Sequence, residues 1–177
     1  EMLRSLVGSE MCIRDRYGGI TNTFNYKGID FSFMLQFNYG NDIYNATRLY
    51  ATQTNTQRRN QLAEVADRWS PTNASNKVPR YNGYVVNDVY SRFVEDGSFL
   101  RLKNITLGYT LPHKWTRSFH VSKLRVYATG QNLFCFNNYS GYDPEVSTAS
   151  KSPMTPGLDW GAYPKSRVFT FGIDLQF

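Results

Sequence analysis

The sequence predicts an all-β fold, namely a segment of an antiparallel transmembrane β-barrel. Three observations support this prediction. Apolar and polar residues alternate along much of the chain, the alternating segments are unusually long, and the connections between them alternate between short and long. Alternation with a period of two is typical of a strand that has one apolar and one polar face. A run of about 18 apolar residues, which a transmembrane helix would need, does not occur.

The composition excludes several other classes of protein. Aromatic residues make up 16% of the 177 residues and charged residues only 19%, whereas disordered chains are poor in aromatics and rich in charge. Two cysteines are too few for a disulfide framework or for a zinc site made of cysteines. The net charge of +6 permits an acidic partner without requiring one.

The alternation is clearest in residues 29–39, where Ile29 and Phe31 begin a series of apolar odd-numbered positions. The preceding residues 20–26 also have the composition of a strand. Only Lys27-Gly28 separates the two segments. A two-residue connection that contains glycine predicts a tight β-hairpin.

Three further alternating segments follow in the C-terminal half. In the first of them, Leu102 is out of phase with Ile105, and a β-bulge near Lys103-Asn104 would reconcile the two halves. Several segments exceed the usual strand length of ~5–6 residues, and a tilted strand of about ten residues crosses the apolar band of an outer membrane. The expected strands are residues 20–26, 29–39, 99–111, 123–133 and 167–177.

The connections between these strands differ greatly in length. Residues 40–98 and 134–166 form two long connections, whereas residues 27–28 and 112–122 form shorter ones. Outer-membrane barrels have short periplasmic turns and long extracellular loops. The alternation of short and long connections therefore predicts two long extracellular loops. It also predicts that the C-terminus at Phe177 lies in the periplasm.

The first long loop contains one helical pattern. Leu62, Val65, Ala66 and Trp69 are spaced as one face of a two-turn helix, which Ser70-Pro71 would end. We therefore expect a short loop helix there.

The first sixteen residues differ in character from the rest. Residues Leu6 to Arg16 correspond to one reading frame of a transposase-type sequencing adaptor, and the segment lacks the features of a secretory signal. We expect residues 1–16 to be a sequencing-adaptor artefact and residues 17–177 to be the C-terminal portion of a longer receptor barrel.

Residues 17–177 contain a series of motifs that together resemble the C-terminal barrel of the SusC/RagA family of TonB-dependent outer-membrane transporters. The motifs follow the order and spacing of that family. They are YGGITNTFNYKGIDFSFMLQFNYGNDIYN (17–45), the RW-SP element (68–71), SRFVEDGSFLRLKNITLGYTLP (91–112), LRVYATGQNLF (124–134), NYSGYDPEVS (138–147) and PGLDWGAYPKSRVFTFGIDLQF (156–177).

The resemblance implies that the chain supplies the last five strands of a 22-stranded barrel with a plugged lumen. It implies import of oligosaccharides or peptides across the outer membrane, without a cofactor and without enzymatic activity. The implied partners are a SusD-class surface lipoprotein over the extracellular mouth, the TonB complex through an N-terminal part, and outer-membrane lipid. The chain alone is not expected to transport.

The last strand carries a motif of its own. Thr170, Gly172, Leu175 and Phe177 match the pattern of an outer-membrane insertion signal, in which a polar residue and a glycine precede apolar positions and a terminal Phe. An exposed aromatic-rich strand can pair with the edge of the barrel-assembly machinery by strand addition.

Aromatic side chains in the two long loops are the candidate contacts for a substrate or partner. Flat aromatic rings stack on the apolar faces of sugars, and Arg58, Arg59, Arg68 and Arg80 would add hydrogen-bond donors. The alternative is packing within the loops or in the aromatic girdles of the barrel. The candidates are Trp69, Tyr81, Tyr84, Tyr139, Tyr142, Trp160 and Tyr163.

We expect no catalytic, metal or nucleic-acid site. His113 and His120 lack partners at metal-ligand spacing, and Cys135 lacks a patterned base. Asp143 and Glu145 could suggest glycoside hydrolysis, but loop turns explain them better. No nucleic-acid recognition motif accompanies the basic residues.

A soluble β-rich carbohydrate-binding module remains the alternative, because a β-sandwich also needs alternating strands. The two folds differ in what surrounds the strands. In a barrel the apolar positions face lipid, and Asp30, Gln36, Asp174 and Gln176 face a wet lumen. In a sandwich the same apolar positions form a buried core.

Overall fold

The computed structural model describes residues 16–53, 60–81, 89–116, 121–145 and 157–177. These residues divide into two compact units. The sheet unit comprises the described residues of Arg14–Gly40, Ser98–Asn138 and Lys165–Phe177, and the loop unit comprises those of Asn41–Gly97 and Tyr139–Pro164. None of the described helices is long and apolar enough to cross a membrane.

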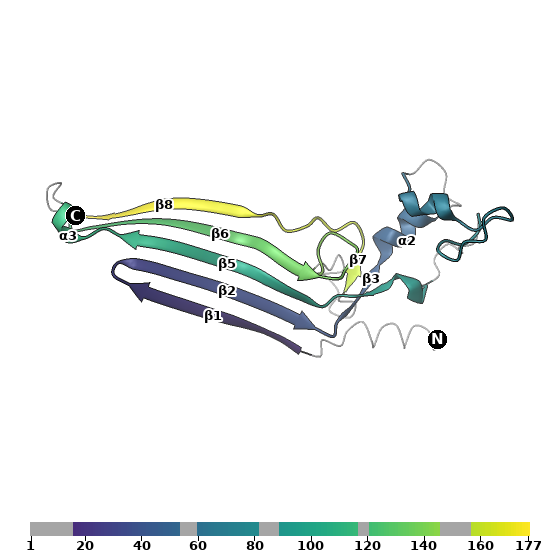
Figure 1. The fold of residues 1–177 in the computed structure, drawn as a ribbon, viewed down its shortest axis with the longest axis horizontal. Helices are drawn as coiled ribbons and strands as arrows, with labels where there is room; N and C mark the ends of the chain where they lie inside the picture. The colour runs from purple at the N-terminus through teal and green to yellow at the C-terminus, as the bar shows by residue number, and fades with distance from the viewer. Residues whose placement is uncertain (1–15, 54–59, 82–88, 117–120, 146–156) are drawn as a thin grey trace. The chain divides into compact units, whose positions relative to one another are not determined.

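The sheet unit is an antiparallel sheet of five long strands that lie side by side in the order β1-β2-β5-β6-β8 (Figure 1). Each strand pairs with the strand that precedes or follows it in this sheet, so the sheet is an up-and-down meander with β1 and β8 at its edges. The five strands predicted from the sequence are confirmed. They are β1 (Arg16–Tyr26), β2 (Ile29–Tyr39), β5 (Phe99–Thr110), β6 (Lys123–Asn137) and β8 (Val168–Gln176).

The predicted hairpin and bulge are both present. Lys27 and Gly28 have φ angles of 47° and 87°, and positive φ at both central residues is typical of the type I′ turn that suits a two-residue hairpin. The pairing of β2 with β5 skips Lys103, which is therefore the bulged residue. The bulge places Leu102 opposite Leu35 and Ile105 opposite Phe33, so both halves of β5 present their apolar side chains on one face.

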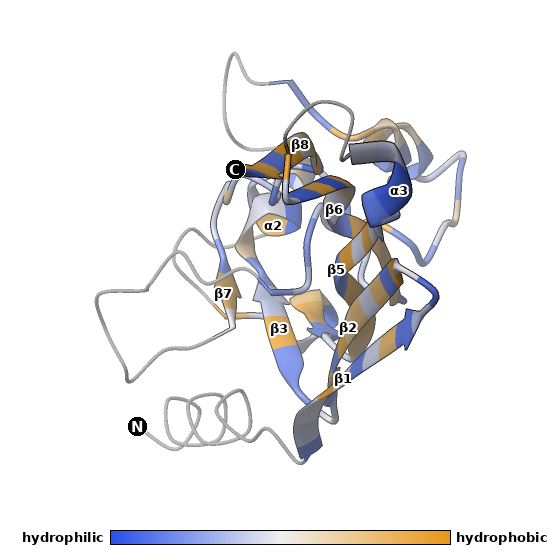
Figure 2. Ribbon diagram, turned by 90° about the vertical axis from the view of Figure 1, so that its left-hand side faces the viewer, coloured by the Kyte–Doolittle hydropathy of each residue, from blue (hydrophilic) through white to orange (hydrophobic). Residues whose placement is uncertain are grey.

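The two faces of the sheet differ in polarity. Figure 2 shows hydrophilic and hydrophobic bands alternating along strands such as β8. Across the sheet, the apolar residues share a face, because Phe31 pairs with Leu107, Leu107 with Ala128, and Ala128 with Phe171. Leu107 is 54% exposed and Phe171 80% exposed. Large apolar side chains of this face therefore lie open, as the barrel interpretation expects of a face turned to lipid.

The polar face carries an ion-pair network that spans four strands. The Arg125 guanidinium on β6 lies 2.6 Å from the Asp30 carboxylate on β2 and 3.0 Å from the Asp174 carboxylate on β8. To reach Asp30, Arg125 must extend across β5. Gly108 on β5 leaves the room, since a Cβ there would lie 2.5 Å from the Asp30 carboxylate oxygens.

The loop unit contains a small mixed sheet in the order β4-β3-β7. The central strand β3 (Asp42–Asn45) pairs antiparallel with β4 (Val94–Asp96) and parallel with β7 (Leu158–Asp159). Helix α2 (Ala46–Thr52) follows β3 directly, and the Asn45 side chain caps it by accepting a hydrogen bond from the Arg48 N–H at 2.8 Å.

The hydrophobic core of the loop unit consists of Tyr44, Ala46, Leu49 and Phe93. These residues come from β3, α2 and the 3₁₀ helix η2 (Ser91–Phe93), so the core joins the start of the first long connection to its end. This packing fixes the segments that line the pocket described below.

The loop helix differs from the prediction. The helix in this segment is the five-residue 3₁₀ helix η1 (Ala63–Asp67), because Leu62 and Arg68 are both extended. The short loop helix is therefore present as predicted, but the expectation of two α-helical turns over residues 62–69 is wrong in length and type. The sequence analysis also did not predict α2, the short strands β3, β4 and β7, or the one-turn helix α3 (His113–Thr116).

Candidate functional site

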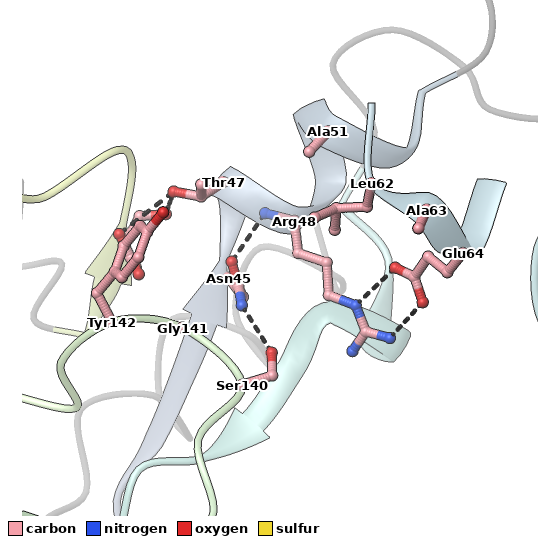
Figure 3. Close-up of a pocket in the computed structure, with 11 residues that line it drawn as sticks. Asn45, Thr47, Arg48, Ala51, Leu62, Ala63, Glu64, Ser140, Gly141 and Tyr142 are labelled. Carbon is pink, nitrogen blue, oxygen red and sulfur yellow. Dashed lines mark hydrogen bonds and ion pairs between the residues drawn. The ribbon is translucent and has the colours of Figure 1, made fainter. Parts of the chain in front are cut away.

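The loop unit contains a cavity of about 470 Å³ that four separate segments line (Figure 3). The first segment is the end of β3 with α2, the second precedes and begins η1, the third follows β6 along the chain, and the fourth is β7. The lining residues are Asn45, Thr47, Arg48, Ala51, Leu62, Ala63, Glu64, Ser140, Gly141, Tyr142 and Asp159.

One arginine links the walls of this pocket. The Arg48 guanidinium donates to both carboxylate oxygens of Glu64, at 3.0 and 2.9 Å, and to Glu95 at 3.2 Å. We call these three residues the Arg48 latch. The hydrogen bonds from Arg48 hold the pKa of Glu64 below its usual value, so the pair is ionised at neutral pH and its charges compensate each other.

Glu95 ties a third segment to the latch. Its carboxylate accepts hydrogen bonds from the Ser140 N–H at 2.9 Å, the Ser140 hydroxyl at 2.8 Å and the Asn45 side-chain amide at 3.2 Å. Burial alone would raise the pKa of Glu95, but the hydrogen bonds from Ser140 and Arg48 outweigh burial and lower it. Glu95 is therefore a half-buried anion that accepts hydrogen bonds from Ser140, Asn45 and Arg48.

Asp159 forms the opposite end of the pocket. Its carboxylate accepts hydrogen bonds from the Tyr139 hydroxyl at 2.6 Å, the Thr47 hydroxyl at 3.3 Å and the Ala162 N–H at 3.3 Å. Burial, together with the hydrogen bond to Asp159, raises the pKa of the Tyr139 hydroxyl. The hydroxyl therefore stays protonated and keeps donating. Asp159 is a structural carboxylate that holds the wall formed by α2.

The other acidic pair, Asp143 and Glu145, forms a turn. The Asp143 carboxylate accepts a hydrogen bond from the Glu145 N–H at 2.9 Å, and Asp143 is buried. This is an Asx turn, which confirms the interpretation of Asp143 and Glu145 as loop-forming residues. In the described part of the chain, no three His, Cys, Asp or Glu side chains are grouped closely enough to hold a metal ion.

The predicted aromatic contacts occupy different places in the loop unit. Tyr142 lines the pocket and is 80% exposed. Trp160 packs against Tyr50 with the rings tilted by 58° and 4.6 Å between their centroids, and Tyr163 is 90% exposed. Tyr139 is buried and engaged with Asp159, so it supports the pocket wall.

The remaining three candidates belong to the first long connection. Trp69 lines a second cavity and Tyr81 is largely exposed. Tyr84 lies outside the described residues. The structure thus brings Tyr142 to the first pocket and Trp69 to another one.

The sequence analysis missed the latch itself. Arg48 bonds to residues 16 and 47 positions further along the chain. A sequence pattern of period two or 3.6 carries no signal for such pairs. The one local signal was Asn45 three residues before Arg48, which is the spacing of a helix N-cap.

No family model matches the chain. Three curated proteins are similar to it over 90% of its length. It is 36% identical to TonB-dependent receptor P3 and 37% identical to TonB-dependent receptor P26, both from Formosa agariphila. It is 34% identical to TonB-dependent receptor SusC from Bacteroides thetaiotaomicron. The chain spans only 15–16% of these three relatives.

Solved structures of transporters share the fold. The structure of the RagAB peptide transporter matches 91% of this chain with a TM-score of 0.76 and 25% identity, and the match covers 17% of that chain. The RagAB peptide importer in its closed-closed state matches 94% of this chain and 18% of that chain, with a TM-score of 0.79 and 24% identity.

Proposed function

Because this chain is a member of the SusC and RagA family of TonB-dependent receptors, we propose that it forms the C-terminal part of an outer-membrane transporter that imports oligosaccharides or peptides. The identity of 36% over nine-tenths of the chain is the observation that carries this proposal. The five long strands with one apolar face support it independently, since this is the pattern of a transmembrane barrel wall.

Residues 17–177 then contribute the last five strands of the barrel, and residues 1–16 are the sequencing-adaptor artefact. In the meander, the connections from β2 to β5 and from β6 to β8 leave the same end of the sheet. These two connections supply the loop unit. We assign this end to the extracellular side, which assigns the Lys27-Gly28 turn and Phe177 to the periplasmic side.

The pocket at the Arg48 latch is the substrate or partner contact of this part of the transporter. Arg48 pairs with Glu64, and Asp159 accepts hydrogen bonds from Tyr139, Thr47 and Ala162, so the ionised groups that line it are engaged within the chain. Polar groups and an exposed tyrosine complete the lining. Such a surface suits a neutral, polar ligand. Tyr142, Trp160, Tyr163, Trp69, Tyr81 and Tyr84 are the proposed contact residues.

The proposed partners follow from the relatives. RagAB is described as a peptide transporter, and for this chain we assign a SusD-class lipoprotein to the extracellular side. The TonB complex would act through a part of the protein N-terminal to these residues. We assign the transporter no enzymatic activity, since its relatives are receptors and transporters.

Strand β8 is the proposed signal for the barrel-assembly machinery. Thr170, Gly172 and Leu175 lie on this strand, which pairs with β6 on one side and forms an edge of the described sheet. Phe177 follows it directly and is largely exposed. An unpaired edge with these side chains is suited to strand addition.

Uptake by the complete receptor tests the proposal. The full-length gene, recovered by sequencing across codon 17 of its source locus, is expressed with and without TonB, and labelled oligosaccharides and peptides are followed into the cells. We expect TonB-dependent uptake that Tyr142→Ala reduces several-fold, because aromatic contacts are among the strongest in binding sites.

Tyr26→Ala is the matched control, since Tyr26 is an exposed tyrosine on β1 of the sheet unit. It should leave uptake unchanged. Uptake that proceeds equally without TonB would contradict the transporter assignment, and so would recovery of the receptor from the soluble fraction without detergent.

A further inference from the structure

The terminal strand β8 carries one glycine, and this glycine is covered although it lies on an edge strand. Gly172 is opposite Tyr127 on the neighbouring strand β6, which lies alongside β8 (Figure 1). Every other residue of β8 is largely exposed, whereas Gly172 is half-buried. A side chain from β6 therefore reaches over the edge strand at this position.

The covering group is the Tyr127 ring. A Cβ atom built on Gly172 would lie well inside van der Waals contact of the Tyr127 Cζ and Oη atoms. The φ angle of Gly172 is not positive, so the backbone conformation does not require glycine here. What requires glycine is the space that the ring occupies. An aromatic ring that packs on a glycine of an edge strand is one of the devices that pin strand register.

Arg125 supports this ring and also holds β8 directly. Its Cζ lies 5.0 Å from the centroid of the Tyr127 ring, and its Nη1 lies 3.0 Å from the Asp174 carboxylate. Asp174 follows Gly172 by two residues and therefore shares its face of β8. The ring and the ion pair thus join β6 to β8 at two successive positions of the polar face.

These two contacts are compatible with one register of β8. A slip of one residue would turn the apolar side chains of β8 to the polar face. A slip of two residues would bring Thr170 or Asp174 under the Tyr127 ring in place of the only glycine of the strand. Closure of a barrel requires a fixed stagger between its strands, so the register of the last strand affects the closing pair.

We propose that Tyr127 is a positioning residue for the terminal strand, and that Gly172 serves the insertion signal by accepting the Tyr127 ring within the barrel wall. The exposed apolar side chains of β8 and its free backbone edge then remain for strand addition to the assembly machinery. This inference rests on the proposed outer-membrane barrel and specifies what one residue of its insertion signal does.

Refolding of the full-length receptor from urea into lipid vesicles that contain no assembly machinery tests the inference. Gly172→Ala should lower the heat-modifiable, folded fraction several-fold, because the added methyl group displaces the Tyr127 ring. Tyr127→Phe keeps the ring and should fold like the wild type. A glycine that only the assembly machinery reads would cause no defect in this system.

A double variant identifies the ring as the cause. Because Gly172 and Tyr127 are in contact, the effects of their substitutions should not add. Gly172→Ala/Tyr127→Ala should therefore fold at least as well as Gly172→Ala. Thr129→Ala is the matched control, since Thr129 is two residues from Tyr127 on the same face of β6 and lies opposite Thr170. Combined with Gly172→Ala, it should leave the defect in full.

A cross-link reports the register. Lys123 lies opposite Gln176 in the native pairing, so Lys123→Cys and Gln176→Cys should react with one short thiol-specific cross-linker. After protease has removed unfolded chains, the yield should be several-fold lower when Gly172→Ala is added. Mass spectrometry of the joined peptides measures the yield.

Three results would overturn the inference. Gly172→Ala could refold like the wild type in vesicles and fail only in cells, the two substitutions could lower the folded fraction additively, or the cross-link yield could be unchanged by Gly172→Ala. Failure of the proposed function looks different. In that case the wild-type receptor itself forms no heat-modifiable, protease-resistant barrel in vesicles, which would overturn both.

Discussion

At the scale of single residues, Arg48 determines the shape of the first pocket. Its guanidinium contacts Glu64 in η1 and Glu95 on β4, and Glu95 in turn accepts hydrogen bonds from Ser140. Three segments that are distant in sequence therefore meet at one cation. Helix α2 positions this cation, because the Asn45 cap sets where the helix begins.

Removal of the guanidinium should loosen the loop unit. Arg48→Met retains much of the side-chain volume but leaves Glu64 and the more deeply buried Glu95 without their cation. We expect the free energy of local opening to fall by about 1–3 kcal/mol, after allowing for partial exposure of the pair. Hydrogen exchange of residues 41–52 and 94–97 in the full-length receptor measures the change.

Lys77→Gln is the control for this prediction, since the Lys77–Asp67 pair is largely exposed and exposed pairs contribute little. Its exchange should match that of the wild type. Equal protection in Arg48→Met and the wild type would show that the apolar core, not the latch, holds these segments together.

The same carboxylates predict a dependence of stability on pH. Hydrogen bonds from Arg48 lower the pKa of Glu64. Those from Ser140 and Arg48 lower that of Glu95 against the effect of burial. A carboxyl group whose pKa is lower in the folded state stabilises that state above its unfolded pKa, here about 4.5, and this stabilisation is lost as the pH falls through the folded pKa.

Protection of residues 41–52 should therefore be constant from pH 8 to about pH 5 and decline below about pH 4.5. In Arg48→Met the decline should be shallower, because the protons that Glu64 takes up no longer break a hydrogen bond to Arg48. A decline of equal steepness in both proteins would assign the effect to other carboxyl groups.

The candidate site could be predicted only in part from the sequence. Aromatic enrichment of the long loops pointed to Tyr142 and Trp69, and both line cavities. The ion pairs that shape the first pocket join residues brought together only by the folding of the loop unit. Their formation depends on tertiary packing, which residue type and spacing do not encode locally.

At the scale of elements, the alternation of apolar and polar residues predicted the long strands with little ambiguity. Each strand has enough residues for a period of two to stand out, and the phase change at Lys103 located the bulge. Strands β3 and β7 have four and two residues, too few for any period to be read. Helix α2 has only seven residues, so the spacing of its buried Ala46 and Leu49 is too short a pattern to predict a helix.

The two faces of β2 should respond oppositely to the same substitution. Leu35 lies on the apolar face, paired with Leu102, and Met34 lies on the polar face, paired with Asn104. If the apolar face meets lipid, Leu35→Arg should destabilise the full-length barrel by about 2–4 kcal/mol, the cost of arginine near the middle of a bilayer. Met34→Arg, one residue away, should be tolerated in the polar lumen.

Heat-modifiable mobility of the receptor in gels and its urea-unfolding midpoint in lipid vesicles report the difference. The comparison is well matched because both changes replace an apolar residue on one strand by arginine. Equal effects of the two substitutions would contradict a lipid-facing assignment and favour a structure in which both faces are covered by protein.

At the scale of the whole molecule, the five-stranded sheet has two edges that the described residues leave open. Strand β1 pairs with β2, and β8 pairs with β6, so each edge strand offers one row of backbone groups for further pairing. A lipid-exposed sheet edge is not tolerated in a membrane. In the proposed barrel the edges therefore pair with further strands; the chain spans about a sixth of its relatives.

This requirement leads to the final prediction, which compares residues 17–177 alone with the full-length receptor. When each is refolded from urea into lipid vesicles, the full-length receptor should form a heat-modifiable, protease-resistant barrel. Residues 17–177 alone should aggregate or remain protease-sensitive, because they have both a large apolar face and two unpaired edges. Phe171 and Leu107 on that face would have only lipid or another copy to contact. A monomer of residues 17–177 that stays folded without detergent would instead show that the sheet buries its apolar face within the chain, and the β-sandwich alternative would then replace the barrel.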